Sequence, residues 1–287
     1  MRIGKNILFW TGMRSGSGVI FRGNDIVIVD SQMRKDQATL MLELMELYGL
    51  NSKNIKYVIN SHGDPDHVGG NAELLRATKA KLVAHTLDAD IIEDPGKRPM
   101  GGSPFTAARE GPREGCKVDV KIKGNDEILK VGALSLRLIL TPGHTSGSMS
   151  IYDEESKALF TGDLVLGSGY DCYSVPMVRA GIETVIRSLE KLSVLNVEWL
   201  LPGHGDVIYG ARTVNERIKG HIRELNRLPN RIMKILGEKA STVAEVSDEL
   251  LVWPQTVEKV LSNLEKEGKI QKVEEKTTTT TSKWKAA

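Results

Sequence analysis

The stretch SHGDPDHVGG, from Ser61 to Gly70, decides how this sequence is interpreted. Six consecutive positions within it hold four potential metal ligands: His62, Asp64, Asp66 and His67. They come directly after residues 56–59, whose apolar character predicts a strand. Two carboxylates this close in a turn repel each other unless a cation lies between them. The stretch therefore predicts a metal site at the end of a strand.

Three later segments share this design, with a ligand residue placed directly after an apolar strand and beside glycine. They are TPGHT at 141–145, FTGD at 160–163 and LPGHG at 201–205, and they contribute His144, Asp163 and His204. A strand end holds a side chain rigidly, and glycine lets the backbone pass close to an ion. Four such segments in one chain favour a shared metal centre over unrelated turn and capping histidines.

The elements around these segments predict an α/β fold. Apolar residues at helical spacing predict helices at 35–48, 72–77 and 182–195. Residues 94–115 interrupt the pattern with many prolines and glycines, and both a lid over a site and an ordinary surface connection remain open for them. Short apolar or β-branched runs between turn residues predict strands at 6–11, 17–22, 26–30, 56–59, 81–84, 134–140, 149–152, 158–161 and 197–201.

The chain changes character near residue 212, after which helical patterns follow as far as Gly268. Thr242 and Glu245 form a capping box at the start of one helix, and residues 270–273 predict a strand before a threonine run. We therefore expect a catalytic domain at 1–211 and a small winged-helix domain with a flexible tail at 212–287. Glutamates are interleaved with the lysines of its second helix, which does not favour nucleic-acid binding.

The composition restricts the class of protein. Hydrophobic residues make up 40% of the 287 positions, and the net charge of +2 gives no field that would attract nucleic acid or an anionic membrane. No apolar run approaches the ~18 residues of a membrane span, and no secretory signal is recognisable. Cys116 and Cys172 lie far apart, which rules out a disulfide framework. We expect a cytoplasmic protein with a small-molecule substrate and no membrane partner; a homodimer remains open.

In their order along the chain, the four ligand segments resemble the metallo-β-lactamase superfamily over roughly residues 1–210. The resemblance implies a four-layer αβ/βα sandwich with a dinuclear metal site. Asp30, in the segment IVDS, matches an aspartate that the family keeps behind the metal loop to orient a ligand. The resemblance also implies the ligand sets, which are His62, Asp64 and His144 for one metal, Asp66, His67 and His204 for the other, and Asp163 as the bridge.

Asp64 departs from the family pattern, because most members have a second histidine at this place. A carboxylate adds a negative charge, which should favour iron or manganese relative to zinc. Flavodiiron proteins of the superfamily carry a carboxylate here, although they usually append a flavin domain that this sequence does not show. We expect two divalent metal ions, with zinc as the first assignment and iron or manganese as alternatives.

The sequence is also similar to a lactamase-β-2-like group that joins this catalytic domain to a C-terminal winged helix, through FTGDLVLG at 160–167 and HIRE at 221–224. In that group the second domain mainly forms one wall of the cleft, and some members cleave single-stranded RNA. Our leading interpretation is hydrolysis of a small ester, thioester or lactone by a metal-bridged hydroxide, which Asp66 orients before passing a proton to the leaving group. An endoribonuclease and a di-iron oxygen-binding or redox protein remain alternatives.

Three further side chains are candidates for substrate contact. His85 follows the strand at 81–84, and Tyr170 and Tyr173 come soon after Asp163, where a tyrosine could hydrogen-bond a substrate carbonyl. The alternatives are an ordinary strand-end histidine and packing within a loop. Two other residues are not expected to react: His221 lies inside a helical pattern, and Cys172 has no evident partner base.

Overall fold

The computed structural model describes residues 1–11, 16–97, 114–169, 173–273 and 282–287. Two of the residues considered above, Tyr170 and Cys172, lie outside the described residues, and so does most of the 94–115 segment. None of the described helices is long and apolar enough to cross a membrane.

The first sheet contains seven strands that lie side by side in chain order. Its first four strands pair antiparallel, and β4 to β7 pair parallel. Strand β4 has the sequence IVIV and is buried throughout, as expected for a strand covered on both faces. The strands are β1 (Arg2–Ile3), β2 (Ile7–Trp10), β3 (Gly18–Arg22), β4 (Ile26–Val29), β5 (Ile55–Ile59), β6 (Lys81–His85) and β7 (Val120–Ile122).

The second sheet contains six strands in the order β13-β12-β11-β10-β9-β8. All its neighbours pair antiparallel except β11 and β12, which are parallel because the chain passes through a helix between them. The strands are β8 (Asp126–Val131), β9 (Leu134–Leu140), β10 (Met149–Asp153), β11 (Ala158–Phe160), β12 (Trp199–Leu201) and β13 (Ile208–Tyr209).

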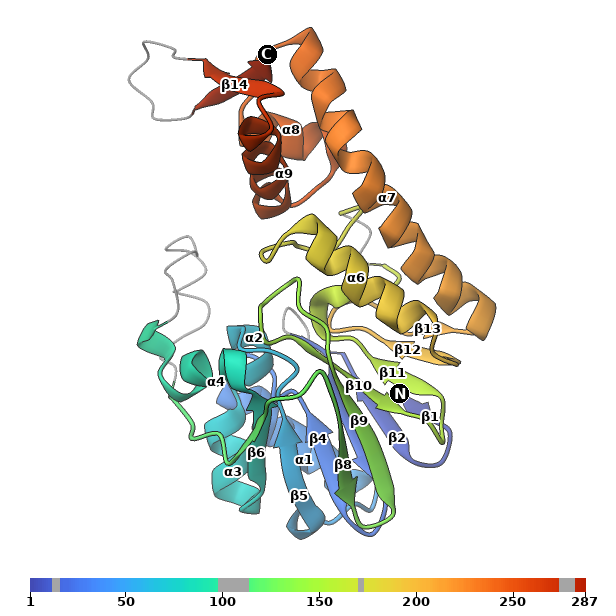
Figure 1. Cartoon of the computed structure of the whole chain (residues 1–287). Helices are drawn as coiled ribbons and strands as arrows, with labels where there is room; N and C mark the ends of the chain where they lie inside the picture. Colours follow the sequence, from blue (N-terminus) through green and yellow to red (C-terminus); the bar gives the residue numbers. More distant parts are fainter. Residues whose placement is uncertain (12–15, 98–113, 170–172, 274–281) are drawn as a thin grey trace.

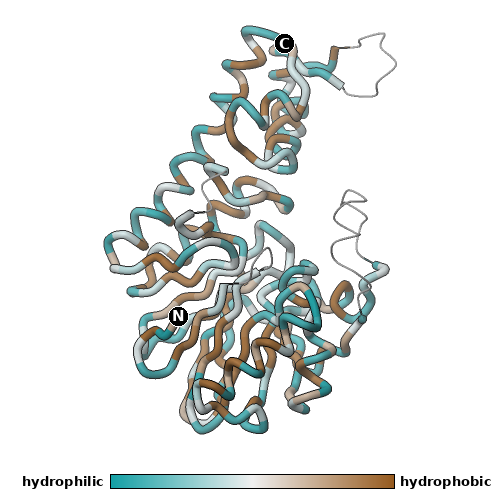
Figure 2. Tube along the Cα trace, turned by 180° about the vertical axis from the view of Figure 1, so that it is seen from behind, coloured by the Kyte–Doolittle hydropathy of each residue, from teal (hydrophilic) through white to brown (hydrophobic). Residues whose placement is uncertain are grey.

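The two sheets pack face to face through one hydrophobic cluster that includes Phe21 and Val29 from the first sheet and Leu136 and Phe160 from the second. Figure 2 shows this as hydrophobic colouring along the strands. Helices cover both outer faces: α1 (Lys35–Leu47), α3 (Asn71–Thr78) and α4 (Thr86–Glu93) lie against the first sheet, and α6 (Ile182–Ser193) and α7 (Ala211–Glu238) against the second (Figure 1). The expected four-layer αβ/βα sandwich is confirmed.

Helix α7 carries the chain away from the second sheet to a C-terminal group of helices (Figure 1). There α8 (Val243–Leu250) and α9 (Pro254–Lys266) precede a hairpin of β14 (Ile270–Val273) and β15 (Lys283–Ala286). The capping box of Thr242 and Glu245 is present at the start of α8. One hydrophobic cluster continues from Leu189 in α6 to Leu261 in α9, so this group shares a core with the sandwich. The winged-helix assignment and the boundary after residue 211 stay predictions.

Candidate metal centre

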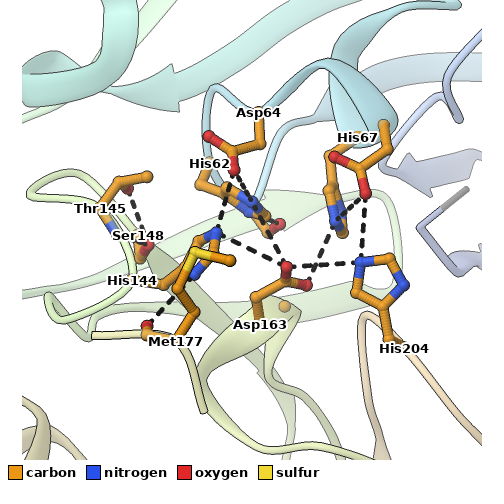
Figure 3. Close-up of polar contacts among 12 residues, drawn as sticks. His62, Asp64, His67, His144, Thr145, Ser148, Asp163, Met177 and His204 are labelled. Carbon is orange, nitrogen blue, oxygen red and sulfur yellow. Dashed lines mark hydrogen bonds and ion pairs between the residues drawn. The ribbon is translucent and has the colours of Figure 1, made fainter. Parts of the chain in front are cut away.

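The seven ligand residues expected from the sequence converge just beyond the ends of strands from both sheets. Figure 3 shows this convergence for all of them except Asp66, which it does not label. Each segment begins where a strand ends, so the strands fix the backbone next to the ligands. His62 and Asp64 follow β5, Asp66 and His67 lie in the short helix α2 (Pro65–Val68), His144 follows β9, Asp163 lies in the 3-10 turn η3 (Gly162–Leu164) after β11, and His204 follows β12.

These side chains form two adjoining groups whose candidate ligand atoms lie within 4.8 Å of one another: His62, His144 and Asp163, and Asp66, His67 and His204. We call them the His144 group and the His204 group. Asp163 lies between them, with Oδ2 at 3.6 Å from His144 Nε2 and 3.4 Å from His204 Nε2. Its other oxygen, Oδ1, is 3.2 Å from His67 Nε2. One carboxylate therefore reaches both groups.

The hydrogen bonding of the centre indicates what it holds. Among the described residues, His62 Nε2, His67 Nε2 and Asp163 Oδ1 are buried and make no well-formed hydrogen bond, although the last two lie 3.2 Å apart as an ion-pair contact. Native proteins rarely leave buried polar atoms unpaired, and imidazole nitrogens with carboxylate oxygens are the donors that zinc and similar metals accept. The residues therefore fit two divalent ions, one in each group, with Asp163 between them.

Asp30 and Ser61 orient the histidines from behind. The carboxylate of Asp30 is fully buried and accepts three hydrogen bonds of 2.7 Å, from His67 Nδ1, Ser61 N and Ser61 Oγ. Asp30 has a φ of 59°, an unusual backbone conformation for a residue other than glycine. Because Nδ1 of His67 is engaged by Asp30, its Nε2 faces the cluster. Ser61 Oγ also lies 2.9 Å from His62 Nδ1, a contact that the sequence pattern did not reveal.

Asp88 in α4 ties the two metal-binding loops together. Its Oδ2 accepts hydrogen bonds from Gly63 N at 2.9 Å and Thr145 Oγ1 at 2.7 Å, and its Oδ1 accepts one from Gly147 N at 2.8 Å. These donors flank His62 on one loop and His144 on the other. Sequence reasoning missed Asp88 because it did not predict α4. The available signal is an aspartate on the same side of that helix as the apolar Ala89 and Ile92.

Asp64 is placed differently from the other ligand candidates. Its Oδ2 is 3.0 Å from His144 Nε2 and 4.0 Å from His62 Nε2, but Asp64 belongs to neither three-residue group. Instead, Nη1 of Arg179 lies 2.9 Å from both of its oxygens. Arg179 belongs to no recognisable motif, and sequence reasoning missed it.

The C-terminal helices support the loop that carries Arg179. Nδ1 of His144 lies 3.4 Å from the carbonyl oxygen of Met177 (Figure 3). The next residue, Val178, donates its N–H to Oγ1 of Thr256 in α9 at 2.9 Å. Tyr173 stacks on Trp253 at the start of α9, with ring centroids 3.7 Å apart. Helix α9 therefore supports the backbone of Met177 and Val178, which contacts His144.

Burial and charge set the protonation of the histidines without metal. Burial, together with the neighbouring His67, lowers the pKa of His62 to about 3. For His204, burial alone would lower the pKa, but the carboxylates of Asp163 and Asp66 outweigh it and raise the pKa to about 10. The same balance holds the pKa of His67 well above its usual value. The His204 group therefore carries protons that a metal ion must displace.

The other residues considered from the sequence, His85, Tyr173 and His221, lie outside the two groups of metal ligands. His85 is buried and caps α4, where its Nδ1 accepts a hydrogen bond from Leu87 N at 3.2 Å. No hydrogen bond or ion pair joins it to the metal cluster within the described part of the chain, so a substrate role for His85 stays a prediction. Tyr173 packs on Trp253, and His221 is buried in α7, where burial lowers its pKa to about 4.

Among curated proteins, residues of this chain match a Beta-lactamase-like protein 2 homolog of Caenorhabditis elegans with 29% identity over 187 residues, which is 65% of this chain and 54% of that protein. The thioesterase pkgB of Emericella nidulans is 31% identical over 170 residues, 58% of this chain and 40% of that protein. The matched regions thus span about half the length of these relatives.

The fold recurs in a crystal structure of a metallo-beta-lactamase family protein from Thermus thermophilus, with a TM-score of 0.75 and 18% identity. The match covers 98% of this chain and 99% of that one, and at this identity it concerns the fold alone. Residues 11–204, which include the ligand segments, match the sequence pattern of the Metallo-beta-lactamase superfamily. The chain belongs to the metallo-beta-lactamase superfamily.

Proposed function

We propose that the protein is a metal-dependent hydrolase of small thioesters, with related esters and lactones as poorer substrates. The observation that carries this proposal is the position of Asp163 between two groups of potential ligands, in which the buried Nε2 atoms of His62 and His67 make no hydrogen bond in the described structure. When bound, two divalent ions would supply an activated water and a Lewis acid for the substrate carbonyl. Zinc is the metal we expect, with iron or manganese as alternatives.

Asp66 is the residue we expect to handle protons. Its side chain is 24% exposed, compared with 11% for Asp163 and 7% for Asp64, so water and a leaving group reach it most easily. Its Oδ2 lies 3.2 Å from His204 Nε2, which fixes the direction of the carboxylate. Asp66 can therefore orient the attacking water and pass its proton to the departing thiolate or alkoxide.

Two observations support a thioester. One relative is named a thioesterase, although it matches only 58% of this chain. A thiolate is also a better leaving group than an alkoxide, so it needs less help from a protonated side chain. The pKa of Asp66 is lowered, because His67 and His204 outweigh its burial, so its carboxyl is rarely protonated and gives such help poorly.

The test compares an acyl thioester with the oxygen ester of the same acyl group, using protein stripped of metal and reloaded with zinc, manganese or iron. We expect turnover only after reloading, and faster turnover of the thioester. His62→Ala should lose this activity, whereas Glu46→Ala, an exposed change on α1, should keep it. Hydrolysis that survives in His62→Ala would not come from this site. Cleavage of single-stranded RNA that is lost in His62→Ala, without thioester turnover, would overturn the proposal in favour of a ribonuclease.

A further inference from the structure

Asp64 brings a charge into the centre that a histidine at the same position would not bring. Its side chain is only 7% exposed, and burying an ionised carboxylate is costly unless a partner compensates it. It also lies 3.0 Å from His144 Nε2, close enough to compete with a metal for this ligand. The centre therefore needs a group that neutralises Asp64.

Arg179 provides this charge from a fixed position. Its Nη1 is 2.9 Å from both Asp64 oxygens, and its side chain is 35% exposed, so the guanidinium keeps some contact with water while it faces the cluster. Burial acts to lower the pKa of Arg179, but the carboxylate of Asp64 outweighs it and keeps the guanidinium charged.

The backbone of Arg179 is anchored on both sides. Its N–H donates to the carbonyl oxygen of Gly143 at 2.9 Å, directly before the ligand His144, and the preceding Val178 is bonded to Thr256. The backbone of Arg179 thus binds the loop that carries His144, and from this position its guanidinium reaches Asp64.

We propose that Arg179 is a positioning residue that neutralises Asp64 and restrains its two oxygens, so that the pair takes the place of a neutral histidine beside the His144 group. An aspartate and an arginine together add no net charge, as a neutral histidine adds none. A free carboxylate at this position would favour hard ions such as manganese. Arg179 withdraws Asp64 from that role and keeps the preference of the His144 group for zinc.

A double-mutant cycle tests this proposal through metal binding. Arg179→Ala, Asp64→His and the double variant are prepared as full-length, metal-free chains, and their affinities for zinc and for manganese are measured by competition with a chelator. The ratio of the two affinities is the informative quantity, because the repulsion between a guanidinium and a divalent ion affects both metals and cancels in the ratio.

We expect Arg179→Ala to raise the ratio of manganese to zinc affinity by about tenfold, because partners of metal ligands commonly change metal affinity by about 10- to 100-fold and the freed carboxylate favours the harder ion. In the Asp64→His background, the same change should leave the ratio within about twofold. Arg179→Ala should also lower the thermal midpoint of the metal-free protein, because it leaves a buried carboxylate without its cation. Arg187→Ala, which removes an exposed arginine on α6, is the matched control and should change neither quantity.

Two results would overturn the role of Arg179: an unchanged ratio in Arg179→Ala, or an equal change of the ratio in both backgrounds. The inference rests on the proposed metal centre but not on its substrate. Failure of the wild-type chain to bind either metal would overturn the centre itself, whereas normal wild-type binding with uncoupled variants would overturn only the role of Arg179.

Discussion

The two halves of the metal centre are supported in different ways. In the His204 group, Asp30 binds the ring of His67, and Ser31 donates to the carbonyl oxygen of His67. Asp30 and Ser31 directly follow β4. The His144 group depends on a loop, because Met177 contacts His144, and Arg179 contacts the neighbouring Asp64, from a segment that α9 supports. One half is therefore built into the first sheet, and the other rests partly on the C-terminal helices.

This difference shows how a second group of helices can affect a metal site without contributing a ligand. The His204 group should be insensitive to changes in α9, whereas the His144 group should respond to them. Changes at Asp163, which both halves share, should affect both equally.

The largest effect is expected at this shared residue. Asp163→Ala should reduce bound metal from about two ions per chain to none and abolish hydrolysis, because it removes a carboxylate that reaches both groups. His144→Ala should instead lose one ion and keep the other. Elemental analysis of the purified variants gives the counts. Full occupancy in Asp163→Ala would contradict the bridging position.

A smaller effect, confined to one half, is expected at Asp30. Asp30→Ala removes the partner of His67 Nδ1 and should weaken metal binding in the His204 group about 10- to 100-fold. The His144 group should keep its affinity, although Ser61 also loses its two hydrogen bonds to Asp30. Titration with a chromophoric divalent ion such as cobalt distinguishes two affinities from one. Equal weakening of both sites would show that the halves are not independently supported.

A still smaller effect, confined to the other half, is expected at Thr256. Thr256→Val keeps the shape of the side chain but leaves the N–H of Val178 without its acceptor, which should cost about 1–3 kcal/mol of stability. Metal affinity of the His144 group should fall by less than the roughly tenfold expected of a direct partner. Thr256→Ser, which keeps the hydroxyl, is the control. If Thr256→Val weakened only the His204 group, the comparison between the halves would be reversed.

The extent to which the sequence predicts this structure depends on how local each signal is. The ligands are recognisable because each lies a few residues after an apolar strand, and Asp30 is recognisable by its resemblance to a family motif. Arg179 and Thr256 have no such signal, since their partners Asp64 and Val178 are 115 and 78 residues away.

Missed elements have physical causes of their own. Strand β8 was not predicted because it lies at a sheet edge, where Ile128 is 61% exposed and the charged residues of its sequence DEILKV do not alternate with the apolar ones. Helix α4 was not predicted because it is short and carries two buried apolar residues, Ala89 and Ile92. Strand β7 has only three residues and a single fully buried one. Each depends on neighbours that a local pattern does not contain.

The smallest expected effect is a difference in the number of protons that the two halves release when metal binds, and it can be measured without a mutation. The pKa of His204 is raised to about 10 and that of His67 is also raised, whereas that of His62 is lowered to about 3. At a pH of about 7.5, metal loading should therefore release about two protons, one each from His67 and His204. His62 should release none, because it is already neutral at this pH.

The sign of the pH dependence follows from these directions. A histidine whose pKa is raised stabilises the metal-free protein below its unfolded pKa of 6.5, and this contribution is lost as the pH rises through about 10. The metal-free protein should thus lose stability over this range, while metal affinity should increase as the competing protons leave. Calorimetric titration in two buffers of different ionisation enthalpy measures the protons released. A heat of binding that does not depend on the buffer would mean that His67 and His204 are already neutral, and the electrostatic difference between the halves would then not exist.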